Sequence, residues 1–367
     1  MKRRDVIAGL GSGILAAGLT ACGNQADTKK SATSSFKTIH WSMVTTWPKN
    51  FQGLGEGAEY LAKLIDNMSG GRLKIRVLGA GEMVPALQVF DTVSAGTAQM
   101  GHGAAYYWKG KMAAAPFFGA VPFGMNAQEM NAWLLKGEGL KLWEALYEPF
   151  DVIPRPCGNT GVQMAGWFNK EINNLDDLKG LKMRIPGLGG EVLKRAGGVP
   201  VLLPGSEVFT SLERGALDAA EWVGPYNDLA FGLYKAAKYY YYPGWHEPGS
   251  TMEAIINKQA LRSLPDDLQA IVLNACLIAN QDMLSEFTFR NFEALNTLQN
   301  QHHVILKKLP DEVLDHLKKL SVEVVKESVA NDKQGQKIYQ SYHDFLKGVK
   351  KWTALSEMAY LQARQDS

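Results

Sequence analysis

The sequence predicts an α/β protein with about two domains' worth of chain. Its 367 residues exceed the usual length of one domain. Of these residues 46% are hydrophobic, which is enough for a sizeable core. Apolar and polar residues alternate over 38–44 and 73–78, as in strands, whereas 58–68 carries apolar residues at helical spacing. Such alternation of strands and helices is typical of a largely parallel sheet.

Similar patterns continue along the chain and give way to helices near its end. Pro265 begins a long helical stretch to about residue 298, because proline is tolerated in the first turn of a helix. From Pro310 onward the pattern is helical and amphipathic, with stripes formed by Val313, Leu317, Leu320 and Val324 and by Tyr339, Tyr342 and Phe345. These stripes fit packing on the same domain or on a second subunit. The elements predicted in between are strands at 99–105, 151–156, 162–168, 181–186, 199–203 and 216–223, and helices at 85–95, 189–196 and 206–214.

The first 36 residues have the composition of an export segment and a tether. Residues 1–21 start with Lys2, Arg3 and Arg4 and continue with an apolar, glycine-rich run, which predicts a signal peptide. The paired arginines leave the Sec and twin-arginine routes open. The closing LTAC resembles a lipoprotein-processing box, in which Cys22 becomes the lipidated N-terminus. Residues 22–36 are polar and are expected to form a flexible tether.

Charge and motifs exclude several classes of protein. Without residues 1–21 the chain carries 36 basic and 36 acidic residues, so no global charge favours nucleic acid. The motifs HExxH, GxSxG and GxxxxGK[ST] are absent. The glycines of 187–190 resemble a dinucleotide loop, but the next strand comes too early for that fold. Cys157 and Cys276 lack metal-ligand spacing, and whether they pair is left open.

Arg184 is the first candidate binding residue. Apolar and charged residues alternate over 181–185, and Pro186 and Gly187 then end the predicted strand. Ligands of open α/β sheets bind at the carboxyl ends of strands, where Arg184 should lie. Its guanidinium could hold a carboxylate by two parallel hydrogen bonds, although a solvated surface arginine would show the same pattern.

Three further polar residues stand among apolar and aromatic neighbours. They are Gln163 in GVQMAGWF, Glu221 in LDAAEWVGP and Glu247 in YYYYPGWHEPG. Burying such carboxylates is costly without a cation or a donor nearby. Their oxygens are hard ligands that suit Na⁺ or Ca²⁺. Surface salt bridges fit the pattern equally well, and paired carboxylates also allow a glycosidase.

Several segments resemble the solute-binding subunits of tripartite ATP-independent periplasmic (TRAP) transporters, and most closely the branch that binds 2-oxo acids. The segments are WPKNFQGLGEGAEYLAKLI, LGAGEMVPALQVFDTVSAGTAQMGH, GNTGVQMAGWFNKEINNLDDLKGLKMRIPG and LDAAEWVGPYNDLAFGLYKAAKYYYYPGWHEPG. The resemblance implies a two-lobed periplasmic binding protein with a cleft between its lobes, long connecting helices and a C-terminal helical tail. We expect lobe 1 at 37–158, completed by about 251–310, and lobe 2 at 159–250, with 311–367 as a helical dimerisation element.

The resemblance also implies a role for each site residue. Arg184 would pair with the ligand carboxylate, and Asn159 would donate a hydrogen bond to the ligand. Either Tyr106 or Tyr107 would contribute a hydroxyl group from the other lobe. The expected cation ligands are Gln163, Glu221 and the main-chain carbonyl of Trp222, with Glu247 at both the metal and the substrate.

The resemblance implies a binding protein that is not an enzyme. It would capture a small, pyruvate-like 2-oxo monocarboxylate together with a metal cation, Na⁺ rather than Ca²⁺, and deliver it to a TRAP membrane permease. Exchange of the C-terminal helix between two subunits would make it a homodimer, and the lipid on Cys22 would anchor it at a membrane. The alternatives are a lactate-like or longer organic acid, a binding protein of an ABC-type importer, and a secreted hydrolase that uses Glu221 and Glu247.

Overall fold

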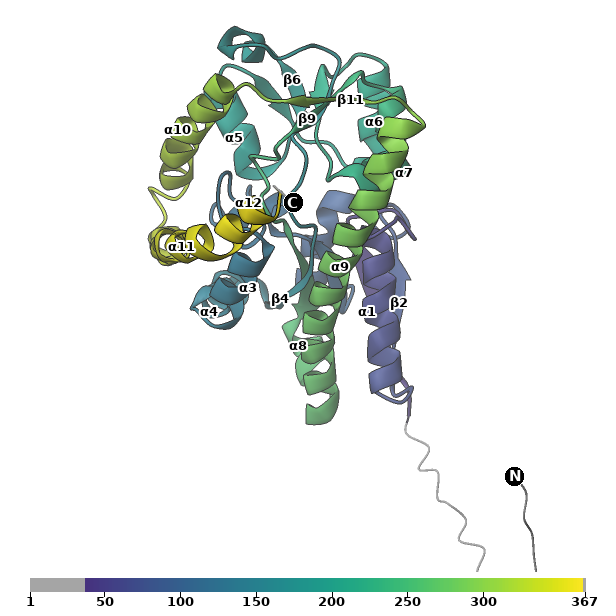
Figure 1. Ribbon diagram of the computed structural model, residues 1–367. Helices are drawn as coiled ribbons and strands as arrows, with labels where there is room; N and C mark the ends of the chain where they lie inside the picture. The colour runs from purple at the N-terminus through teal and green to yellow at the C-terminus, as the bar shows by residue number, and fades with distance from the viewer. Residues whose placement is uncertain (1–36, 366–367) are drawn as a thin grey trace, which may run out of the picture. The chain divides into compact units, whose positions relative to one another are not determined.

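The computed structural model describes residues 37–365, in which two β-sheets lie one above the other (Figure 1). Residues 38–365 belong to one compact unit. The predicted signal peptide at 1–21, the lipidation site Cys22 and the tether at 22–36 lie outside the described residues. No helix of the described part is long and apolar enough to cross a membrane.

The first sheet has five strands in the order β2-β1-β3-β10-β4. Strand β1 pairs in parallel with β2 and β3, whereas β10 runs antiparallel to its two neighbours, β3 and β4. The strands are β1 (Ile39–Thr45), β2 (Leu73–Leu78), β3 (Met100–Ala104), β4 (Val152–Asn159) and β10 (Thr251–Asn257). The helices that belong with this sheet are α1 (Leu54–Met68), α2 (Val89–Ser94), α3 (Ala127–Leu135), α4 (Gly139–Tyr147) and α8 (Lys258–Arg262).

The second sheet has six strands in the order β11-β9-β5-β8-β6-β7. Strand β6 pairs in parallel with β7 and β8, whereas β5 runs antiparallel to β8 and β9. The strands are β5 (Gly166–Phe168), β6 (Lys182–Arg184), β7 (Val199–Val201), β8 (Ala219–Ala220), β9 (Tyr239–Tyr242) and β11 (Ile305–Lys308). The helices next to it are α5 (Gly187–Arg195), α6 (Gly205–Glu213) and α7 (Pro225–Phe231).

The expectation of a largely parallel sheet is confirmed for β1, β2 and β3, which pair in parallel, but each complete sheet is mixed. Strand β10 causes the difference in the first sheet. The chain leaves that sheet after β4, builds most of the second sheet, and returns as β10 between β3 and β4. A strand that returns this way enters against the direction of its neighbours. The local strand and helix patterns were therefore informative, whereas the pairing depended on long-range connections.

Helix α9 (Asp266–Asn300) connects the two sheets and begins after Pro265, as predicted. Its first half packs on β4 and α1, and its second half packs on α7 (Figure 1). Cys276 of α9 belongs to a core beneath the first sheet, together with Cys157 of β4. Further along, Phe287 and Leu298 belong to a core that also contains Trp167 of the second sheet. Both cysteines are buried free thiols.

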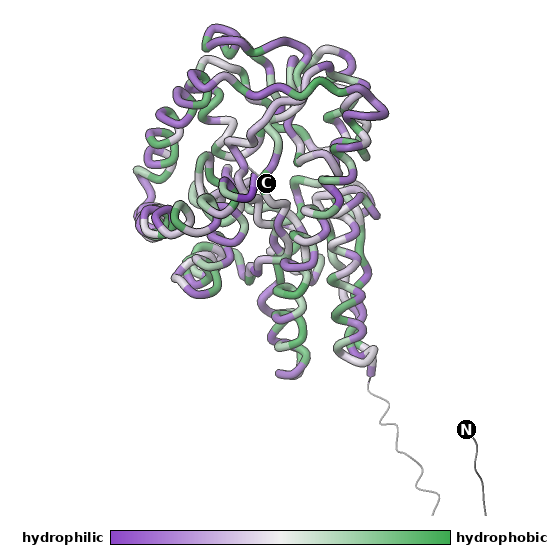
Figure 2. The backbone as a smooth tube through the Cα atoms, in the orientation of Figure 1, coloured by the Kyte–Doolittle hydropathy of each residue, from purple (hydrophilic) through white to green (hydrophobic). Residues whose placement is uncertain are grey.

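The C-terminal helices pack on their own chain before the tail becomes exposed. Helix α10 (Asp311–Glu327) packs on α5, and α11 (Lys333–Thr353) packs on α3 and α4. The predicted stripes are the buried faces of α10 and α11, whose hydrophilic and hydrophobic residues alternate (Figure 2). Tyr342 of α11 is buried, and its hydroxyl accepts a hydrogen bond from the Met125 amide at 2.9 Å. A π-helical turn (Ala354–Met358) and α12 (Ala359–Gln365) follow. Large apolar side chains are exposed from the end of α11 onward: Trp352, Leu355, Met358, Tyr360 and Leu361.

Candidate functional site

Arg184 is the last residue of β6, at the carboxyl end where the sequence placed it. Its side chain is only 1% exposed. Nη1 donates to the backbone oxygen of Glu221 at 3.0 Å and to the Glu221 carboxylate, and Nε donates to the Leu203 oxygen at 3.3 Å. Glu221 directly follows β8, which lies parallel to β6. The parallel pairing therefore brings both side chains to one edge of the sheet.

Two aromatic residues also contact the Arg184 guanidinium. Its carbon lies 4.9 Å from the centroid of the Trp222 ring, a cation–π contact. Nη2 is 3.5 Å from the Tyr107 hydroxyl. Because Nε and Nη1 are engaged by protein oxygens, Nη2 is the nitrogen with donor capacity left for a ligand.

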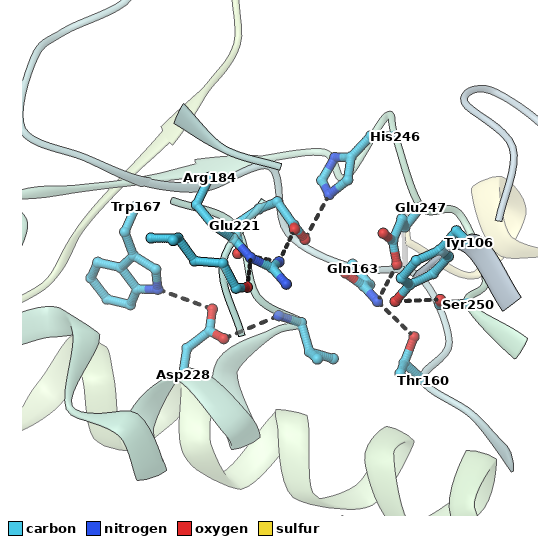
Figure 3. Close-up of polar contacts among 12 residues, drawn as sticks. Tyr106, Thr160, Gln163, Trp167, Arg184, Glu221, Asp228, His246, Glu247 and Ser250 are labelled. Atoms are coloured by element: carbon cyan, nitrogen blue, oxygen red, sulfur yellow. Dashed lines mark hydrogen bonds and ion pairs between the residues drawn. The ribbon is translucent and has the colours of Figure 1, made fainter. Parts of the chain in front are cut away.

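His246 completes this cluster, and the sequence analysis missed it. It lies in the loop between β9 and β10 with only 1% of its side chain exposed. Its Nε2 is 3.1 Å from the second carboxylate oxygen of Glu221. Figure 3 shows Arg184 and His246 approaching Glu221 from different sides. The signal that could have revealed it is the HEPG sequence directly after YPGW.

Gln163 and Glu247 form the neighbouring part of the site (Figure 3). Gln163 Nε2 donates to Glu247 Oε2 at 2.9 Å and to the Thr160 hydroxyl at 3.1 Å. The backbone N–H of Gln163 also donates to the Glu247 backbone oxygen at 3.2 Å. Burial and the nearby charge of Glu221 raise the pKa of the Glu247 carboxyl to about 7. This buried acid therefore loses its proton only near neutral pH.

The donor set fits a metal cation. One ligand atom each from Glu221, His246 and Glu247 can be chosen so that all lie within 4.8 Å of one another. Gln163 Oε1 is buried and accepts no hydrogen bond from the described residues. A cation between these groups would satisfy that oxygen and offset the cost of burying two carboxyl groups. Three of the predicted ligand residues, Gln163, Glu221 and Glu247, are thus close together, and an imidazole stands beside them.

The tyrosines and Asn159 lie around this cluster in different ways. Tyr106 and Tyr107 lie in the short helix η2 (Ala105–Trp108), and the Tyr106 hydroxyl is 3.4 Å from the Ser250 hydroxyl. Burial raises the pKa of both tyrosines, that of Tyr107 to about 12, so both keep their protons as donors. Asn159 ends β4 and donates to the Thr251 hydroxyl at 3.2 Å. Its contact with a ligand stays a prediction, as does cation binding by the Trp222 carbonyl.

Contacts between the two sheet regions enclose the site. Lys109, which follows η2, forms an ion pair with Glu191 of α5. The Phe123 amide donates to the Trp245 oxygen at 2.8 Å. Together with the Tyr107–Arg184 contact, these interactions hold the two lobes against each other. In the described structure the polar cluster is therefore shielded from water between the two sheet regions.

Residues 43–332 match the sequence model of the bacterial extracellular solute-binding proteins, family 7. The chain belongs to this family. A monocarboxylate 2-oxoacid-binding periplasmic protein of Nostoc sp. (strain PCC 7120) is 43% identical over 360 residues, which cover 98% of each chain. The crystal structure of a TRAP periplasmic solute-binding protein from Pseudoalteromonas atlantica T6c, with bound sodium and pyruvate, is 43% identical with a TM-score of 0.86. It covers 89% of this chain and 99% of its own.

A second crystal structure, of a TRAP periplasmic solute-binding protein from Colwellia psychrerythraea, contains calcium and pyruvate. It is 42% identical with a TM-score of 0.86, and the match covers 89% of this chain and all of that one. These likenesses confirm the two-lobed fold predicted for this TRAP solute-binding protein. The chain is therefore a solute-binding protein of the TRAP type and not an enzyme, so the ABC-importer and hydrolase alternatives are wrong.

Proposed function

We propose that this TRAP solute-binding protein captures a small 2-oxo monocarboxylate such as pyruvate together with a metal cation, and delivers it to its permease. The observation that carries the proposal is the buried Arg184 beside the oxygens of Gln163, Glu221 and Glu247. The two similar crystal structures, which hold pyruvate with sodium or calcium, support it.

In this proposal one part of the site binds the ligand carboxylate and the other part binds the cation. Arg184 Nη2 and the Tyr107 hydroxyl donate to the ligand carboxylate, because the hydroxyl lies beside this guanidinium nitrogen. Gln163, Glu221, Glu247 and the Trp222 carbonyl hold the cation, which supplies positive charge to the carboxylate and oxo oxygens. Asn159 and Tyr106 line the cleft and donate to the ligand. Closure of the lobes removes water and strengthens each polar contact.

We propose Na⁺ as the cation, since one of the two similar crystal structures contains it together with pyruvate, whereas the other contains calcium. The hard oxygens of Gln163, Glu221 and Glu247 suit either ion, so separate titrations with sodium and with calcium decide between them.

Calorimetric titration of pyruvate into wild-type and variant proteins tests the proposal. Arg184→Ala should weaken binding by about 100-fold or more, since it removes a buried charged donor. Arg195→Ala is the matched control, because Arg195 is an exposed arginine that pairs with Glu327. Unchanged pyruvate affinity in Arg184→Ala would overturn the assignment. Titrations with propionate, lactate and a longer 2-oxo acid define which ligand groups the site requires.

We also propose that residues 1–21 direct export and that a lipid on Cys22 anchors the protein at a membrane, with 22–36 as the tether. The lobe boundaries remain 37–158 with about 251–310 for lobe 1 and 159–250 for lobe 2.

The exposed apolar tail supports a homodimer, with Leu355 80% exposed and Trp352 69% exposed. The dimer contact is thus assigned to the end of the 311–367 region, because its earlier helices pack on their own chain.

A further inference from the structure

The bond between His246 and Glu221 defines the orientation of both side chains. A carboxylate can only accept hydrogen bonds, so His246 Nε2, at 3.1 Å from Glu221 Oε2, must carry a proton. His246 Nδ1 is buried and has no hydrogen-bond partner among the described residues. The imidazole therefore makes its hydrogen bond to Glu221 through Nε2, while Nδ1 stays without a hydrogen bond to the described residues.

Close packing holds the imidazole in this position. A Cβ atom added at Gly189 of α5 would lie 2.8 Å from His246 Cβ, too close for any side chain. The Trp245 ring lies beside the imidazole, with 5.5 Å between the ring centroids. These contacts and the 1% exposure of its side chain show that His246 is closely packed beside Glu221.

Glu221 is consequently held by one donor on each of its two oxygens. Arg184 donates to Oε1, and His246 donates to Oε2. Each carboxylate oxygen has two lone pairs, so each can still accept a second interaction. The two donors fix the plane of the carboxylate and direct its remaining lone pairs, while Glu247 and the unpartnered Gln163 Oε1 stand nearby.

We propose that His246 is a positioning residue that orients Glu221 for cation binding, and thereby sets the affinity for the cation and its organic partner. This inference rests on the proposed function, because it assigns His246 a role at the same cation site. Partners that orient a metal-binding side chain typically contribute 10–100-fold to metal affinity. His246 would act through its Nε2–H donor and not as a direct ligand.

The test compares His246→Phe with His246→Gln. Phenylalanine fills a similar volume without a donor, whereas the glutamine amide can present an N–H near the position of Nε2. His40→Phe is the control, because His40 is exposed on β1. Calcium chloride alone and, in separate runs, sodium chloride alone are titrated calorimetrically into each protein at constant pH. The thermal midpoint of each protein is measured separately in cation-free buffer.

We expect His246→Phe to weaken calcium binding by about 10–100-fold, and His246→Gln to remain within a few-fold of wild type. A folded His246→Phe with unchanged calcium affinity would overturn the positioning role and leave the proposed function standing. An equal loss in both variants would also overturn it, because the imidazole would then act other than as a donor. A wild-type protein that binds neither sodium nor calcium would overturn the proposed function as well.

Discussion

Breaking the buried ion pair between Arg184 and Glu221 should destabilise the protein strongly, even without a ligand. Both side chains are only 1% exposed. Removing one partner leaves the other as an uncompensated buried charge, which typically costs about 3–5 kcal/mol. We therefore expect Arg184→Met and Glu221→Gln each to lower the free energy of unfolding by about that amount. The double variant should lose clearly less than the sum of the two, because it leaves neither charge unpaired.

Urea denaturation of the four proteins in ligand-free buffer, followed by tryptophan fluorescence, measures this coupling. The matched control is the Lys179–Asp176 pair, whose side chains are 72% and 80% exposed. The same cycle at that pair should give a coupling close to zero, since water screens exposed charges. Additive effects at Arg184 and Glu221 would refute the reasoning. All three site variants should fail to bind pyruvate, including the double variant whose stability is partly restored.

Three further predictions concern other parts of the chain. Burial raises the pKa of Glu253 to about 7, so the native state keeps a proton that the unfolded chain releases near its ordinary value. The free energy of unfolding should therefore fall by up to about 3 kcal/mol between pH 4.5 and pH 7. In Glu253→Gln, denaturation curves should show a weaker dependence of this free energy on pH, and an unchanged dependence would contradict the prediction. Leu355→Glu should give a monomer in sedimentation experiments, whereas a persisting dimer would refute the tail contact. Cys22→Ser should move the protein from the membrane fraction to the soluble fraction of its host, and retention on the membrane would count against lipidation.

Sequence patterns located the parts of the site that depend on local structure. Arg184 could be placed because Pro186 and Gly187 end a short alternating strand, and Glu221 could be placed because it lies near the end of the strand predicted at 216–223. Gln163 and Glu247 were noticeable as polar residues in apolar company. The resemblance to TRAP binding proteins then indicated that these residues share one cleft, which periodicity alone could not establish.

Other features depend on contacts that no local pattern reports. His246 is a single polar residue in a loop, and only the fold shows that its Nε2 meets Glu221. An amphipathic stripe predicts that one face of α11 is buried, but it does not tell which surface covers that face. Tyr342 is covered by its own chain, whereas Trp352 and Leu355 remain exposed. The insertion of β10 between β3 and β4 likewise follows from the path of the chain through the second sheet.

The cation dependence of pyruvate binding tests the central claim most directly. Pyruvate is titrated calorimetrically in a sodium-free buffer with chelator and again at saturating sodium or calcium, and the cation is titrated with and without pyruvate. We predict that one of the cations lowers the dissociation constant of pyruvate at least about tenfold, and that pyruvate tightens cation binding by the same factor, because linkage is reciprocal. An equal pyruvate affinity with and without every cation would contradict a shared site built from Arg184, Glu221, Gln163 and Glu247.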